Sequence, residues 1–226
     1  MSHFVWSAWI ARRRVSKHSY NQRLSRRTRH EEENVNSGDK EAVVDLKRRI
    51  EKRLAYLYSG ELFSIITFVP VGFIVNHQFP HLQLYGLYSF WISFLLLEFL
   101  LLQGTVYWYV KLKRLRKENN PLAPLKVIRQ LHGLKMVNVV MILAAMVAFA
   151  IDFIKWYPSL PLGGLIVTFF IYGFAILEFI NYFYIQLSYD NVSDIKKLVR
   201  GRKLKVSSMN KEFKRMKKEA VQKAPI

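Results

Sequence analysis

The sequence predicts an all-α integral membrane protein with four transmembrane helices, and its composition gives the first reason. The chain is 51% hydrophobic, yet it has 35 Lys and Arg against 16 Asp and Glu, a net charge of +19. A soluble domain rarely combines so much apolar surface with so large an imbalance. The two properties are compatible here because the charges lie in blocks outside four long apolar segments. The aromatic content of 15% suits a protein with Trp and Tyr at membrane interfaces.

The four predicted spans cover about residues 61–76, 86–110, 136–156 and 164–187, within a transmembrane domain of residues 61–188. The first is the weakest, because only ~14 residues are strictly apolar where a crossing needs ~20. Pro70 and Gly72 interrupt it, so we expect it to extend back to Tyr56 or to bend. The third span is rich in small residues, which predicts either the close-packed centre of the bundle or a homodimer contact: Ala144, Ala145, Ala148 and Ala150.

Basic segments flank the predicted membrane domain. Residues 1–40 are polar and irregular and predict a disordered basic extension, which an over-long gene start would also explain. Residues 41–60 predict a cytoplasmic amphipathic helix, since apolar side chains recur every three or four residues among Lys and Arg. Residues 189–226 predict a basic cytoplasmic tail, with some helical amphipathicity around Phe213 and Met216.

The loop charges predict the orientation. The connection after the second span has eight Lys and Arg between Lys111 and Lys135, whereas residues 76–85 have none. Because basic residues stay on the cytoplasmic side during insertion, both termini and the middle loop are expected inside. The sequence therefore predicts a multi-pass protein of a cell membrane, and the absence of targeting features favours a bacterial inner membrane.

An internal repeat is one interpretation of the two halves. Leu97-Glu98-Phe99 and Leu177-Glu178-Phe179 are separated by 80 residues, and the same offset aligns further residues without gaps. The pattern predicts two tandem helical hairpins inserted in the same direction. Chance similarity between apolar helices is the alternative.

Glu98 and Glu178 are the candidate functional residues, because each is predicted near the middle of a span. An ionised carboxylate there costs roughly 2.5–3.5 kcal/mol, and no Lys, Arg or His is predicted at the same depth. The protonated acid is therefore favoured. As a cation- or proton-binding pair they would include Asn181, one turn from Glu178. In the structural interpretation, which we favour, each instead hydrogen-bonds a neighbouring side chain: Ser93, Thr168, Asn138 or Tyr172.

Other polar residues near the spans have simpler expected roles. Glu61 and Asp152 are predicted near span ends, where they reach water or headgroups, and Lys155 is expected to pair with Asp152 on one helix face. Gln103 is a weaker neighbour for Glu98. His77 and His81 have no third ligand nearby, so no metal site is predicted.

No catalytic signature is present, and the absence of cysteine excludes thiol chemistry and disulfides. We therefore expect no enzyme and no cofactor. The leading hypothesis is a non-enzymatic scaffold or regulator that acts through its helices and basic cytoplasmic segments. The alternative is a small proton- or cation-coupled transporter or channel subunit that uses the midplane carboxylates. Expected partners are anionic lipid headgroups and a further copy of the chain, with no nucleic acid.

Overall fold

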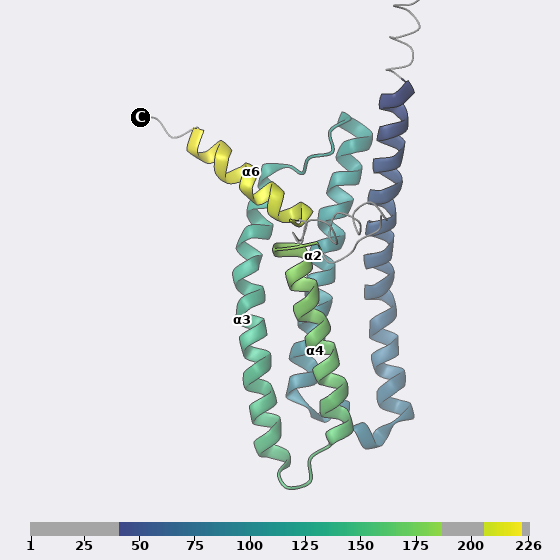
Figure 1. The fold of residues 1–226 in the computed structure, drawn as a ribbon. Coiled ribbons are helices and arrows are strands. Elements are labelled where there is room, and N and C mark those ends of the chain that lie inside the picture. Colours follow the sequence, from purple (N-terminus) through teal and green to yellow (C-terminus); the bar gives the residue numbers. More distant parts are fainter. Residues whose placement is uncertain (1–40, 187–205, 223–226) are drawn as a thin grey trace, which may run out of the picture. The chain divides into compact units, whose positions relative to one another are not determined.

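The structure is a computed structural model that describes residues 41–186 and 206–222. Its regular elements are helical, apart from an isolated bridge between Ile185 and Val206. The predicted disordered extension (1–40) and part of the predicted tail lie outside the described residues. A first helix, Glu41–Gln78, is followed by the short 3-10 helices η1 (Pro80–Leu82) and η2 (Leu84–Gly86). The remaining helices are α2 (Tyr88–Glu118), α3 (Leu125–Trp156), α4 (Leu162–Phe183) and α6 (Ser208–Gln222) (Figure 1).

Four helices are long and apolar enough to cross a membrane: the first helix, α2, α3 and α4. The first helix is a single element of 38 residues, so the predicted boundary between an amphipathic helix and a first span has no structural break. Pro70 and Gly72 lie within it without ending it. Its initial turns, residues 41–50, belong to a separate compact unit, and residues from 51 onward belong to the unit that contains the other helices.

Helix α2 is the centre of the bundle. It packs along both α3 and α4, whereas α3 and α4 make few contacts with each other. In the most apolar stretch of α2, 56% of the residues are buried, against 22% in α3 and 28% in α4. The prediction that the alanine-rich third span forms the centre was therefore wrong: Ala145 and Ala148 are buried, but Met146 and Val147 beside them are exposed.

Small side chains bring α4 close to α2. A Cβ atom at Gly164 would overlap the backbone carbonyl of Leu82, so α4 begins in direct contact with the η1–η2 segment. Thr168 and Ala175 follow on the same buried face of α4. Close packing between small residues is a major source of stability for apolar helices that lie side by side in hydrocarbon.

A reciprocal pair of amides joins α2 to α3. Gln103 Nε2 donates to Asn138 Oδ1 at 2.9 Å, and Asn138 Nδ2 donates to Gln103 Oε1 at 3.0 Å. Both side chains are buried, with exposed fractions of 3% and 0%. Because each amide satisfies the other, the pair fixes the rotation and the register of α3 on α2.

A carboxylate from α3 caps the start of α2. Asp152 accepts hydrogen bonds from the backbone N–H groups of Tyr88 at 3.0 Å and Ser89 at 2.7 Å, and it is fully buried. Negative charge at a helix N-terminus is favourable, because the first N–H groups lack partners within the helix. The predicted ion pair with Lys155 does not form. Lys155 instead donates to the Gly86 carbonyl at 3.3 Å and lies 4.5 Å from the Tyr88 ring.

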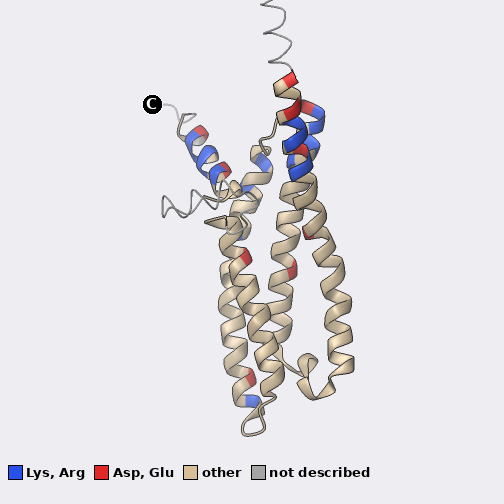
Figure 2. Cartoon of the chain, turned by 45° about the vertical axis from the view of Figure 1, so that its right-hand side comes forward, with Lys and Arg blue, Asp and Glu red and all other residues tan. Residues whose placement is uncertain are grey.

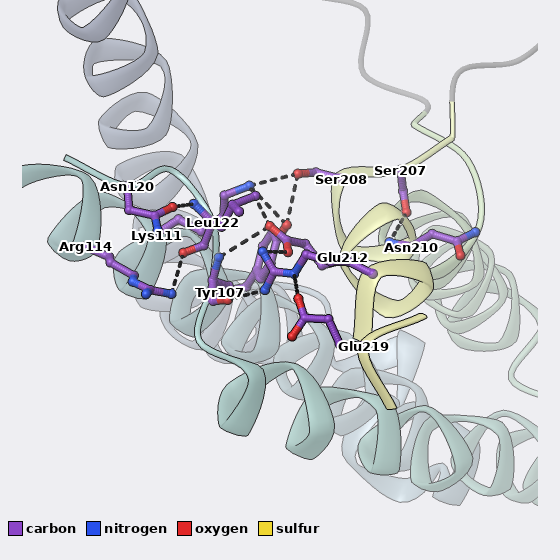
Figure 3. A network of polar contacts seen from close by, with 12 residues as sticks. Tyr107, Lys111, Arg114, Asn120, Leu122, Ser207, Ser208, Asn210, Glu212 and Glu219 are labelled. Atoms are coloured by element: carbon purple, nitrogen blue, oxygen red, sulfur yellow. Dashed lines mark hydrogen bonds and ion pairs between the residues drawn. The ribbon is translucent and has the colours of Figure 1, made fainter. Parts of the chain in front are cut away.

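Helix α6 packs against the opposite end of the bundle, where α2 connects to α3 (Figure 3). Ser207 caps it by accepting from the Asn210 N–H at 3.1 Å. Met209 and Phe213 are buried against the core, and Glu212, only 4% exposed, lies 3.6 Å from Lys111 of α2. This part of the predicted basic tail is thus a folded helix whose lysines face away from the bundle: Lys211, Lys214, Lys217 and Lys218.

Removing the carboxylate of Asp152 is expected to destabilise the fold. Asp152→Ala leaves two buried N–H groups without a partner, which costs about 1–3 kcal/mol for each unsatisfied group. Thermal unfolding followed by circular dichroism in detergent should show a lower midpoint for this variant than for the wild type. Asp152→Asn keeps one acceptor oxygen, so its unfolding midpoint should fall between those of Asp152→Ala and the wild type. A midpoint for Asp152→Ala equal to the wild-type value would show that this cap contributes no stability.

Candidate functional site

A cluster of two carboxyl groups and two aromatic side chains surrounds Gly104 of α2. Glu61 of the first helix accepts a hydrogen bond from Trp108 Nε1 through Oε1, at 2.8 Å. Tyr182 of α4 is buried, and its hydroxyl lies within hydrogen-bonding reach of both Glu61 and Glu178. We call these four side chains the carboxyl cluster: Glu61, Trp108, Glu178 and Tyr182.

Gly104 makes the cluster sterically possible. A Cβ atom at this position would overlap the carboxyl group of Glu61 and lie 2.6 Å from the Tyr182 hydroxyl. The missing side chain of Gly104 therefore leaves the space that the two polar groups occupy. Trp108 lies one turn further along α2, and Tyr182 one turn beyond Glu178 on α4, so the helical repeat places each pair on one face.

The cluster has fewer hydrogen-bond donors than its acceptors require. A phenol has one proton to donate, so Tyr182 can donate to only one of the two carboxyl groups at a time. The Oε2 atom of Glu61 is buried and has no well-aligned hydrogen bond of its own. Within the part of the chain that the structure describes, neither carboxyl group forms an ion pair with Lys, Arg or His. If one carboxyl group keeps its proton, it donates to the hydroxyl, and the network is satisfied.

The structure brings together only part of the predicted site. Asn181 Nδ2 donates to Glu178 Oε2 at 3.3 Å, so these two predicted residues lie in contact beside the carboxyl cluster. Glu98 lies elsewhere on α2, and both of its carboxyl oxygens are buried without a hydrogen-bond partner. Glu61 and Glu178 are thus the two carboxyl groups beside Tyr182, and among the described residues no contact links Glu98 to either of them.

None of the four hydrogen-bond partners proposed for the two glutamates bonds either of them. Asn138 pairs with Gln103, and the Tyr172 hydroxyl donates to the Ile142 carbonyl at 3.2 Å. The hydroxyl groups of Ser93 and Thr168 are buried without a hydrogen-bond partner in the described structure. The structural interpretation of Glu98 therefore lacks the partners on which it depended.

Two of the cluster residues lie in surroundings that differ from those predicted by the sequence. Glu61 was expected to reach water or headgroups, but it lies against Trp108 and Tyr182. Glu178 was predicted near the middle of a span that ended at residue 187; α4 ends at Phe183, only five residues beyond Glu178. The spacing of Glu178 and Tyr182 on one helix face is a signal in the sequence that could have suggested this pair.

No group of three His, Asp or Glu side chains suited to a metal ion occurs in residues 41–186 and 206–222. Towards the α3–α4 connection lies an apolar pocket of about 460 Å³, bounded by the first helix, α2 and α4. Its lining residues are all apolar: Phe68, Val71, Gly72, Val75, Leu84, Phe90, Phe94, Leu97, Val167, Phe170, Ile171 and Phe174.

No known protein family matches the chain, and neither a curated protein nor a solved structure shows significant similarity to it.

Substitution at Gly104 should disturb the carboxyl cluster. In Gly104→Ala, the new methyl group overlaps Glu61 and Tyr182, and overpacking of this kind costs typically 1–3 kcal/mol. We expect a lower thermal midpoint and altered Trp108 fluorescence. Gly173→Ala is a matched control, because a Cβ atom there meets nothing within 4 Å; it should be neutral or stabilising by up to about 1 kcal/mol. Equal midpoints for the two variants would contradict the close packing at Gly104.

Proposed function

We propose that the chain is a multi-pass protein of a cell membrane, in which the first helix, α2, α3 and α4 cross the bilayer. The lengths and apolar character of these helices support this arrangement. The α2–α3 connection and both termini would be cytoplasmic, because the Lys and Arg residues of α2, α3 and α6 gather at that end, with Lys155 as the exception (Figure 2). This excess of Lys and Arg on one side suits a protein of a bacterial inner membrane.

Within this membrane, we propose a non-enzymatic scaffold or regulator rather than an enzyme. The observation that carries this proposal is the uneven distribution of polar groups along the helices. The carboxyl cluster, the ion pair of Lys111 with Glu212 and the exposed lysines of α6 all lie towards the α2–α3 connection. A protein with this distribution meets its partners and its regulatory signals on one side of the membrane.

Transport by the carboxyl groups is the second candidate function, and the carboxyl cluster is the observation that favours it. An ion or proton that reached Glu61 and Glu178 would still have to cross the other half of the bundle. The space there between the first helix, α2 and α4 is the apolar pocket, whose lining offers no polar side chain. Because a charge in such surroundings is costly, the geometry favours binding from one side over transport across a single chain.

Anionic lipid headgroups are the proposed partners of the basic side. Lys and Arg beside a membrane contribute ~1 kcal/mol each near an anionic surface. The second proposed partner is another copy of the chain, through the exposed apolar face of α3, whose residues include Leu143, Met146 and Val147. No nucleic acid is expected to bind.

Tandem duplication is proposed as the origin of the four helices. The first helix moved by 80 residues covers 121–158, close to Leu125–Trp156 of α3. The agreement in position supports two units that insert in the same direction. The limited contact between α3 and α4 means that the second unit would be held together through α2 rather than by its own hairpin.

The orientation can be tested by cysteine labelling, because the natural chain has no cysteine. A single cysteine in His81→Cys should react with a membrane-impermeant maleimide in intact cells. A cysteine in Lys214→Cys should react only after the cells are lysed, since α6 is proposed to be cytoplasmic. The reverse pattern would overturn the proposed topology, and labelling of both positions in intact cells would contradict four crossings.

The choice between regulator and transporter can be tested in liposomes. Purified protein should give no faster proton, Na⁺ or K⁺ flux than protein-free vesicles, and Glu61→Gln and Glu178→Gln should leave that result unchanged. Flux that is present in the wild type and absent in both variants would establish the transporter instead. Circular dichroism of the reconstituted variants checks that they are folded.

A further inference from the structure

The first helix is the least enclosed of the four membrane-length helices. None of the residues in its most apolar stretch is buried, whereas more than half of those in α2 are. Phe63 and Ile66 are 68% and 63% exposed. Its apolar side chains Ile65, Phe68 and Val75 pack against the bundle but are only partly buried, so polar contacts contribute to the position of this helix.

Among the described residues, three polar or aromatic contacts join the first helix to α2 at its more polar end, next to the buried side chain of Leu54. Glu51 pairs with Arg116 at 2.7 Å, but the Arg116 side chain is 56% exposed, and exposed ion pairs stabilise little. The rings of Tyr58 and Tyr109 lie 5.5 Å apart. Glu61 makes the remaining contact, and it is the most enclosed of the three because it also meets Tyr182 of α4.

We propose that Glu61, Tyr182 and Glu178 form a proton-dependent clasp, which holds the first helix against α2 and α4 while one of the two carboxyl groups is protonated. The proposal rests on the membrane-spanning arrangement proposed above and names a means of regulation for it. When both carboxyl groups are ionised, the first helix is released at this end.

The number of protons in the cluster determines the direction of the effect. With one carboxyl group protonated, that group donates to the Tyr182 hydroxyl, and the hydroxyl donates to the other carboxylate, so the chain of hydrogen bonds is complete. When both carboxyl groups are ionised, two negative charges compete for the single proton of the Tyr182 hydroxyl. Their surroundings solvate charge poorly, so the two carboxylates repel each other. Rising pH therefore opens the clasp, and falling pH closes it.

The surroundings of the clasp offer no second charge that would cancel this repulsion in the described part of the chain. From α2 it meets Gly104 and the neutral Trp108, and from α4 it meets Asn181, which donates to Glu178. On α2, the ammonium group of Lys111 lies 5.9 Å from the Trp108 ring. Lys111 is already engaged by Glu212 of α6, at 3.6 Å.

Opening can be measured as a distance between the first helix and α3. We choose Tyr56→Cys and Met136→Cys for spin labels, since these side chains are 72% and 70% exposed and the natural chain has no cysteine. Helix α3 is a suitable reference because the Gln103–Asn138 pair fixes it to α2. Pulsed electron paramagnetic resonance in lipid nanodiscs should show one narrow distance at pH 5. A longer, broader component should grow between pH 5 and pH 9.

Substitutions in the labelled protein identify the groups responsible. Glu178→Gln and Glu61→Gln each leave a single carboxyl group, so the narrow distance should persist across the whole pH range. Tyr182→Phe removes the shared hydroxyl and should give the broad component even at pH 5. Glu98→Gln is the matched control, because it neutralises a carboxyl group of α2 outside the cluster, and it should retain the wild-type pH response.

Two results would overturn the clasp. One is a wild-type distance that does not change with pH, and the other is a pH response that survives in Glu178→Gln or disappears in Glu98→Gln. Neither result depends on whether the proposed function is correct, because the orientation is tested separately by cysteine labelling and transport separately by flux. Circular dichroism at each pH separates helix movement from unfolding.

Discussion

The arrangement of the bundle depends on helix α2, because its polar groups determine where each neighbouring helix lies. Gln103 pairs with Asn138 and so fixes α3, while the first N–H groups of α2 bind Asp152 of the same neighbour. Trp108 binds Glu61 of the first helix, and Lys111 pairs with Glu212 of α6. In hydrocarbon, apolar contacts alone distinguish poorly between one helix rotation and another. A few satisfied polar pairs therefore supply the specificity of the packing.

The polar pairs around α2 differ in how many of their hydrogen-bonding groups have a partner. This difference separates fixed contacts from adjustable ones. The Gln103–Asn138 pair is reciprocal and neutral, so no change of pH within the physiological range affects it. In the carboxyl cluster, two acidic groups share the proton of one hydroxyl, and the number of bound protons changes the balance of forces. The bundle thus combines a rigid α2–α3 pair with a less enclosed first helix, whose attachment includes the adjustable contact.

The sequence was sufficient to predict the four apolar helices, because long hydrophobic runs and the basic segments between them are local properties. The contacts between helices could not be predicted in the same way, because they depend on residues far apart in the sequence. The expected Asp152–Lys155 pair followed from spacing within one helix, but the buried N-terminus of α2 offers Asp152 a stronger partner. Alanine content suggested that α3 is central, although the contacts of α2 decide this. Glu61 and Glu178 could not be paired, since the rotation of each helix about its axis is set by tertiary packing.

The proposed 80-residue repeat clarifies why the described part of the chain contains a single carboxyl cluster. Glu98 and Glu178 are equivalent under this offset, but the residues equivalent to Glu61 and Tyr182 are apolar. Met141 corresponds to Glu61, and Leu102 corresponds to Tyr182, so the face of α2 that carries Glu98 lacks both a second carboxyl group and a shared hydroxyl. Under the proposed duplication, the repeated glutamate would have a second carboxyl group and a hydroxyl as neighbours only where the first helix and α4 meet beside Gly104. Proton-dependent behaviour is therefore expected at one side of α2, and the element that it controls is the first helix.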